Sequence, residues 1–224
     1  MSETAILVAS EIASAGLALV LVYFFSKAYR LTQSVHLLGL PFGFTFLAFS
    51  YIFLGTSILY EANSALSEVS LWLRSLLSSY GFAFIAFSYS FSKETLEKTR
   101  RFLEIVSSAS VISVLLILGG LYIAPPCLEL PPNSVADEWF RLANLVFLVY
   151  IVYALVRQLG SSRQTISGSV WAPSAFSLLA IGQYSQLIHD IDGSQTAFIF
   201  AHIIRIASLL LFISIYYLPE GVPK

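Results

Sequence analysis

Arg205, His202 and Glu11 are the residues of this chain whose types and positions could do chemistry. Arg205 falls near the middle of an apolar run over about 194–218, His202 precedes it by three residues, and Glu11 lies inside the first apolar run. Residues three apart on a helix share a face, so His202 and Arg205 point in a similar direction. An Arg near the centre of a bilayer costs roughly 2.5–3.5 kcal/mol on insertion scales unless an acid or water receives it. We therefore expect Arg205 to have a partner.

Two interpretations of Arg205 remain open. In the first, it is held internally, by Glu11 in an ion pair that His202 could share or by carbonyls of a broken helix. A rise of about 1.5 Å per residue places Glu11, His202 and Arg205 roughly 10, 12 and 16 Å below the same surface. In the second, Arg205 lines an outward-open cavity of net positive charge, which would bind an anionic or carboxylate-bearing ligand. The cavity would add six polar residues, namely Arg74, Arg141, Asn144, Gln183, Gln186 and His189.

The composition identifies the class of protein that must position these residues. Of 224 residues, 57% are hydrophobic and 11% charged, against about 25% charged in soluble domains. The chain is therefore predicted to be a multi-pass protein of the cell membrane, with the lipid bilayer as its first partner. The net charge of −1 gives no reason to expect a nucleic acid. A single cysteine, Cys127, excludes an intrachain disulfide framework.

Seven apolar runs are long enough to cross a hydrocarbon core of about 30 Å, which takes about 20 helical residues. They are continuously apolar rather than alternating, which favours helices over a membrane barrel. The predicted fold is all-α, a single seven-helix transmembrane bundle over residues 1–224. The predicted spans are 4–25, 36–60, 70–92, 102–124, 136–159, 170–191 and 194–218.

The charges between these runs predict the orientation. Nine of the twelve Lys and Arg residues fall on one side of the bundle, and the other side carries acidic residues in its loops. The positive-inside rule then puts the N-terminus outside and the C-terminus in the cytoplasm. The other three of the twelve basic residues lie on the third, fifth and seventh runs, as Arg74, Arg141 and Arg205. Arg74 and Arg141, near the outer surface, can either snorkel to lipid phosphates or pair with an acid from the set Glu68, Asp137 and Glu138.

Two segments, 43–53 and 81–91, are identical at eight of eleven positions and indicate an internal repeat or convergence. Internal repeats are common in transporters, which bind substrate where the repeats meet, often at interrupted helices. Pro41 and Pro173 are candidate interruptions, each expected to kink its helix near the cytoplasmic end. The alternative is that small residues such as Gly43 and Gly81 let the helices pack closely.

The motifs do not indicate an enzyme, and we expect no catalytic residue, cofactor or metal. His36, His189 and His202 lie at unequal depths, which disfavours a haem held between helices. The acids and histidines near Glu11 and His202 could bind a metal, as in seven-helix lipid hydrolases, but the HxxxH spacing of that family is missing. The seventh run has no Lys for a retinal Schiff base.

The span pattern, the Ser-Tyr pairs of the two similar segments and the run Trp72, Leu73, Arg74 loosely resemble uncharacterised seven-helix archaeal membrane proteins. They also resemble the seven-helix input modules of some sensor histidine kinases, although no output domain follows here. The resemblance implies a helical bundle and, more faintly, sensing. Two functions are therefore expected: a receptor or small-ligand-binding bundle with an outward-facing Arg/His/Glu pocket, or a transporter or non-catalytic accessory subunit. Either would involve a membrane protein partner or a second copy of the chain.

Overall fold

The structure is a computed structural model, and it describes residues 3–32, 37–59, 64–90, 133–161 and 171–217. Within these residues the chain forms six helices, and the expected span over 102–124 lies outside them. The all-α fold class is therefore confirmed for the described part. The helices are α1 (Glu3–Thr32), α2 (Gly39–Leu59), α3 (Ser64–Ser90), α5 (Asn133–Ser161), α6 (Trp171–Asp192) and α7 (Gln195–Tyr217).

Five of these helices, α1, α2, α3, α5 and α7, are long and apolar enough to cross a membrane. The sixth, α6, has 22 residues but carries Gln183, Gln186, His189 and Asp190 among its apolar side chains. The helices also extend beyond several of the predicted spans, since α1 continues to Thr32 and α3 begins at Ser64. At these two ends the helices continue past the apolar runs into the polar residues that flank them.

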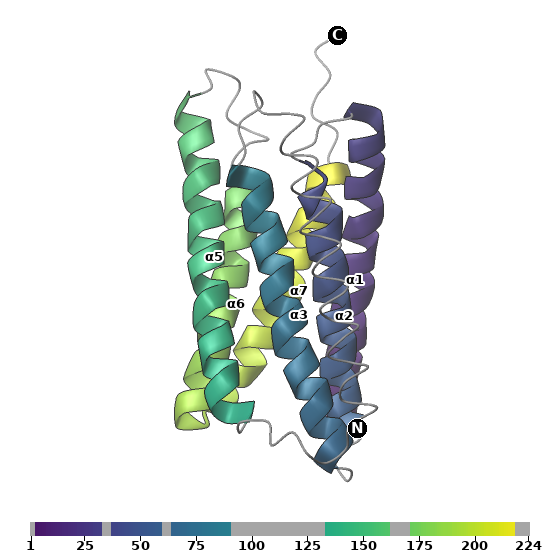
Figure 1. Ribbon diagram of the computed structural model, residues 1–224, viewed down its shortest axis with the longest axis vertical. Helices are drawn as coiled ribbons and strands as arrows, with labels where there is room; N and C mark the ends of the chain where they lie inside the picture. The colour runs from purple at the N-terminus through teal and green to yellow at the C-terminus, as the bar shows by residue number, and fades with distance from the viewer. Residues whose placement is uncertain (1–2, 33–36, 60–63, 91–132, 162–170, 218–224) are drawn as a thin grey trace, which may run out of the picture.

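The six helices form a closed ring in the order α1, α2, α3, α5, α6, α7, with α7 packing back against α1. Figure 1 shows them running lengthwise beside one another, with the start of α1 and the α6–α7 turn at the same end. We call this the N-terminal end: α1, α3, α5 and α7 begin there, and α2 and α6 end there. The ring brings the first and last helices together, which places Glu11 and Arg205 on adjacent elements.

The two similar segments pack against each other between α2 and α3. A Cβ atom added at Gly43 would lie 2.8 Å from the carbonyl oxygen of Gly81, and one added at Gly81 would lie 2.9 Å from the carbonyl oxygen of Gly43. Phe46 and Phe84, each three residues further on, stack with ring centroids 5.4 Å apart. The glycines therefore allow the close backbone approach that the packing interpretation predicts.

The half of the bundle away from the N-terminal end is filled by aromatic rings. The Phe212 ring of α7 packs edge-on against Phe44 of α2 and Phe176 of α6, at 5.6 and 4.7 Å between centroids. Phe25 and Tyr89 extend this group from α1 and α3. We call these five residues the aromatic floor, and it closes the ring interior in this half.

Pro41 and Pro173 do not interrupt helices in the way the sequence suggested. Because α2 begins at Gly39 and α6 at Trp171, both prolines fall in the first helical turn. A missing N–H is tolerated there, since the first N–H groups of a helix have no partner within it. The described helices continue unbroken after these positions, and each proline lies in the first turn of a helix that carries a phenylalanine of the aromatic floor.

Candidate functional site

Arg205 is held by α1 in the buried interior of the N-terminal half. Its Nη2 donates to Glu11 Oε1 at 2.5 Å, and its Nε donates to Ser14 Oγ at 3.1 Å. Glu11 is fully buried and Arg205 is 4% exposed. The guanidinium also lies over the ring of Tyr51 from α2, 4.6 Å from the ring centroid, which is a cation–π distance. The ion pair expected between Glu11 and Arg205 is therefore present.

His202 joins this pair through a single ring nitrogen. Its Nδ1 lies 3.1 Å from Glu11 Oε1, 2.8 Å from Arg205 Nη2 and 3.2 Å from Ser10 Oγ. A serine hydrolase needs its serine and its acid on opposite nitrogens of the histidine. Here Ser10 and Glu11 both approach Nδ1, so the arrangement does not activate Ser10 as a nucleophile. We call Glu11, Ser14, Tyr51, His202 and Arg205 the Arg205 cluster.

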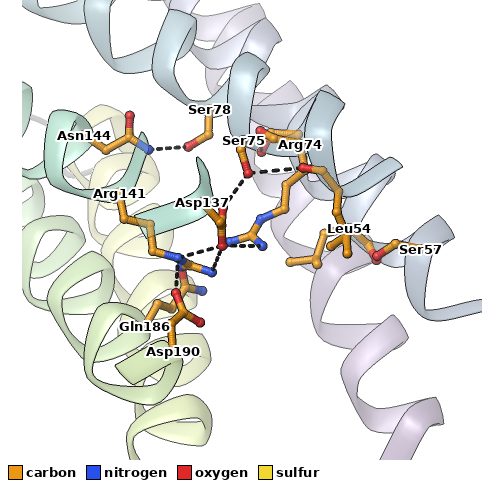
Figure 2. A network of polar contacts seen from close by, with 12 residues as sticks. Leu54, Ser57, Arg74, Ser75, Ser78, Asp137, Arg141, Asn144, Gln186 and Asp190 are labelled. Atoms are coloured by element: carbon orange, nitrogen blue, oxygen red, sulfur yellow. Dashed lines mark hydrogen bonds and ion pairs between the residues drawn. The ribbon is translucent and has the colours of Figure 1, made fainter. Parts of the chain in front are cut away.

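A second, partly buried polar group, centred on Asp137, joins α3 and α5 (Figure 2). Asp137 Oδ2 accepts from Arg141 Nη2 at 2.8 Å and lies 3.4 Å from Arg74 Nη1. Its Oδ1 accepts from the Ser75 hydroxyl. Figure 2 shows Asp137 between the two arginine side chains. Both arginines thus pair with an acid, which is the second of the two alternatives that the sequence left open.

Arg141 connects this group to α6. Its Nη1 donates to Gln186 Oε1 at 2.5 Å, and its Nε forms an ion pair with Asp190. One turn further along α5, Asn144 Nδ2 donates to Ser78 Oγ at 3.1 Å. We call Arg74, Asp137, Arg141, Gln186 and Asp190 the Arg141 cluster. It holds three consecutive helices of the ring together in the N-terminal half.

The structure brings together most of the predicted site residues, but in two groups rather than one. His189 and Gln183 stand apart from both. His189 Nδ1 lies 3.1 Å from the carbonyl oxygen of Ser194, and its ring packs on Phe198, so it supports the α6–α7 turn. Gln183 is half-buried, and within the described residues no hydrogen bond or ion pair joins it to either cluster.

Several members of the clusters were not among the predicted site residues. Ser10 and Ser14 are one helical turn apart around Glu11, and this spacing could have marked a polar face on α1. Tyr51 belongs to the segment similar to 81–91, and nothing in the sequence placed its ring under Arg205. Asp190 lies within the predicted span 170–191 but was not among the predicted site residues, and its carboxylate pairs with Arg141 Nε.

The charges within each cluster balance. Glu11 opposes Arg205, while Asp137 and Asp190 oppose Arg74 and Arg141. The prediction of a cavity with net positive charge is therefore wrong for these residues. The predicted cavity residues included neither aspartate, whereas in the folded chain Asp137 pairs with Arg74 and Arg141, and Asp190 pairs with Arg141.

Five side-chain polar atoms are buried without a hydrogen-bond partner among the described residues. They are Glu11 Oε2, Tyr51 Oη, Ser79 Oγ, Asn144 Oδ1 and His202 Nε2. Most buried polar atoms in proteins are hydrogen-bonded, so each exception asks for an explanation such as a ligand or an internal water. Within the described ranges, no three His, Cys, Asp or Glu residues are grouped so as to hold a metal ion.

Comparisons of the chain with protein-family models, with curated proteins and with solved structures find no match. What the chain does must therefore follow from its own residues. The two neutral clusters and the unpartnered atoms beside them are the features that bear on function.

Proposed function

We propose that this chain is a receptor-like, seven-helix bundle of the cell membrane that binds a small ligand within its N-terminal half. The observation that carries the proposal is the set of buried polar atoms without partners beside the Arg205 cluster. Leaving such an atom unpaired costs about 1–3 kcal/mol. Three of them belong to Glu11, Tyr51 and His202, whose side chains all contact the Arg205 guanidinium through other atoms, so the unpartnered atoms are left to receive polar groups of a ligand.

The asymmetry of the bundle supports binding from one side. Both clusters belong to the N-terminal half, whereas the aromatic floor fills the other half with Phe44 and Phe176 fully buried. A transporter must open alternately to both sides, which would require the floor to separate. A receptor needs access from one side only, and this arrangement favours the receptor.

The proposed orientation puts the N-terminal end outside the cell. Lys27, Arg30 and Arg157 are exposed near the opposite end of α1 and α5, and the positive-inside rule assigns such residues to the cytoplasm. With seven spans the C-terminus is then cytoplasmic. The ligand would enter from outside, and the signal would pass through a membrane protein partner or a second copy of the chain.

Arg205 acts in this proposal as a positioning residue. Its Nε and Nη2 bond Ser14, Glu11 and His202, so these donors are engaged before any ligand arrives. Glu11 Oε1 is fixed by Arg205, which leaves Oε2 directed elsewhere. The guanidinium thus orients the atoms that a ligand would contact.

A second candidate is a non-catalytic accessory subunit. The internal pairing of Arg205 favours it, because a pair with Glu11 neutralises the charge without any ligand. The reciprocal contact of Gly43 and Gly81 also agrees with a purely structural role. In that case the unpartnered atoms would be covered by internal water or by a partner helix.

Cysteine labelling from the outer face separates the two candidates. In a Cys127→Ser background, Ala201→Cys places a thiol in the buried layer beside His202, and Leu209→Cys places one deeper in the core. Ile203→Cys, which is 60% exposed on the outside of the ring, is the lipid-facing control. A membrane-impermeant methanethiosulfonate reagent should modify Ala201→Cys faster than both others. Equal, negligible rates at all three positions would instead support the accessory subunit.

A further inference from the structure

The unpartnered atoms of the Arg205 cluster differ in what they can bind. Glu11 Oε2 is a carboxylate oxygen and only accepts, provided that Glu11 is ionised as its pairing with Arg205 implies. Tyr51 Oη can donate or accept. His202 Nε2 donates or accepts according to the tautomer that Nδ1 adopts among Glu11, Arg205 and Ser10. A single hydroxyl group can satisfy any of these atoms, because it is both a donor and an acceptor.

The charge balance restricts the ligand further. Arg205 is neutralised by Glu11, and the neighbouring Arg74 is neutralised by Asp137. Both arginines are therefore compensated by an acid within the bundle before any ligand binds. A ligand with a net charge of either sign would bring an uncompensated charge into a buried neutral site, which is unfavourable.

We propose, on the basis of the function proposed above, that the ligand is an uncharged molecule bearing hydroxyl groups, held by Glu11 Oε2, Tyr51 Oη and His202 Nε2. Glu11 accepts a hydrogen bond from a ligand hydroxyl, while Tyr51 and His202 complete the contacts. This ligand class replaces the anionic ligand that the arginines alone suggested.

Phe198 is the aromatic neighbour of His202 on the side of the N-terminal end, where we expect access to these atoms. Its ring packs edge-on against His202 at 4.4 Å between centroids and also contacts His189 at 4.7 Å. Phe198 lies one helical turn from His202 toward the N-terminal end of α7. The three atoms are buried in this structure, and we expect the ligand to enter when the Phe198 ring moves aside.

A matched set of three-carbon probes tests the ligand class. Propane-1,2-diol, lactate and 1-aminopropan-2-ol share one hydroxyl and differ in carrying a neutral, anionic or cationic group. Binding to the full chain in lipid nanodiscs can be followed by saturation-transfer difference NMR. We expect the diol to bind more tightly than both charged probes, by on the order of a hundredfold if the charge stays unpaired.

The Tyr51→Phe variant tests the site itself. It removes only the unpartnered hydroxyl and keeps the ring over Arg205, so the protein should fold at least as well as the unchanged chain. We expect it to weaken diol binding by about fivefold, the worth of one hydrogen bond. Tyr153→Phe, on the exposed side of α5, is the control and should bind as before.

The outcomes separate this inference from the function on which it rests. Tighter binding of lactate or of the amine would overturn the neutral ligand class, while labelling of Ala201→Cys would still support a binding bundle. If Tyr51→Phe leaves diol binding unchanged, the Tyr51 hydroxyl is bonded by internal water rather than by the ligand. That result would overturn the proposed binding site. Failure of all three probes together with an unlabelled Ala201→Cys would overturn the proposed function.

Discussion

Glu11 and Arg205 are separated by 194 positions in the chain, yet Oε1 of one and Nη2 of the other lie 2.5 Å apart. The contact exists because α7 returns to α1 and closes the ring of described helices. It fixes the relative rotation of the first and last helices about their axes. It also leaves the second carboxylate oxygen of Glu11 without a partner.

Removing one partner of this pair should destabilise the protein far more than removing both. Arg205→Gln leaves the carboxylate of Glu11 buried and uncompensated, which typically costs about 3–5 kcal/mol. Glu11→Gln should cost a similar amount. The double variant should recover much of the loss, because two amides can bond each other. Reversible unfolding in mixed micelles measures all three variants. Strictly additive losses would show that the two side chains do not interact.

Asp137→Asn should loosen the contacts of α5 with α3. The change removes the negative charge that Arg74 and Arg141 share, and we expect a loss of about 3 kcal/mol in unfolding free energy. Glu138→Gln, at the next position of the same helix, is the matched control and should change stability by less than about 0.5 kcal/mol. Equal effects of the two variants would contradict the central role of Asp137.

Gly43→Ala and Gly81→Ala should each push α2 and α3 apart. The added Cβ would meet a backbone carbonyl oxygen at 2.8 or 2.9 Å, and the backbone cannot move aside as a side chain would. Overpacking of this kind costs about 1–3 kcal/mol. At Gly16 nothing lies within 4 Å of an added Cβ, so Gly16→Ala should be neutral or stabilising by up to about 1 kcal/mol. Thermal unfolding of the three variants gives the comparison.

Phe198→Ala should speed access to the Arg205 cluster. Without the ring that covers His202, labelling of Ala201→Cys by the impermeant reagent should accelerate by about tenfold or more, since the route no longer depends on ring movement. Phe200→Ala is the control, because Phe200 is 49% exposed on the outside of the ring. If Phe200→Ala accelerates labelling as much, the effect comes from general loosening of α7.

Much of the secondary structure follows from apolar runs in the sequence, because a helix is the way for a single segment to satisfy its backbone in lipid. The pairing of Glu11 with Arg205 was also predictable. Both residues stand out against apolar neighbours, and helical rise gives their depths. The close packing at Gly43 and Gly81 was one of two interpretations. Small residues predict that a helix packs closely against another, but not which helix that is.

The contacts of Asp190 and Tyr51 were not predictable in the same way, and Asp137 was one of three acids that the sequence offered to Arg74 and Arg141. The sequence gives the depth of a residue along its helix, but its direction around the axis is hidden when the lipid-facing side is as apolar as the core. Val146 and Ile203 face outward, while Leu148 and Leu209 are buried, and their residue types do not distinguish them.

The sequence by itself therefore determined that the chain is helical and apolar enough for a membrane, and that Arg205 needs an acid. Only the tertiary structure decided the order of the helices in the ring and which polar atoms meet inside it. The physical reason is that insertion into lipid depends on each segment alone, whereas neutrality of the two clusters depends on side chains from separate helices meeting at one depth and one rotation.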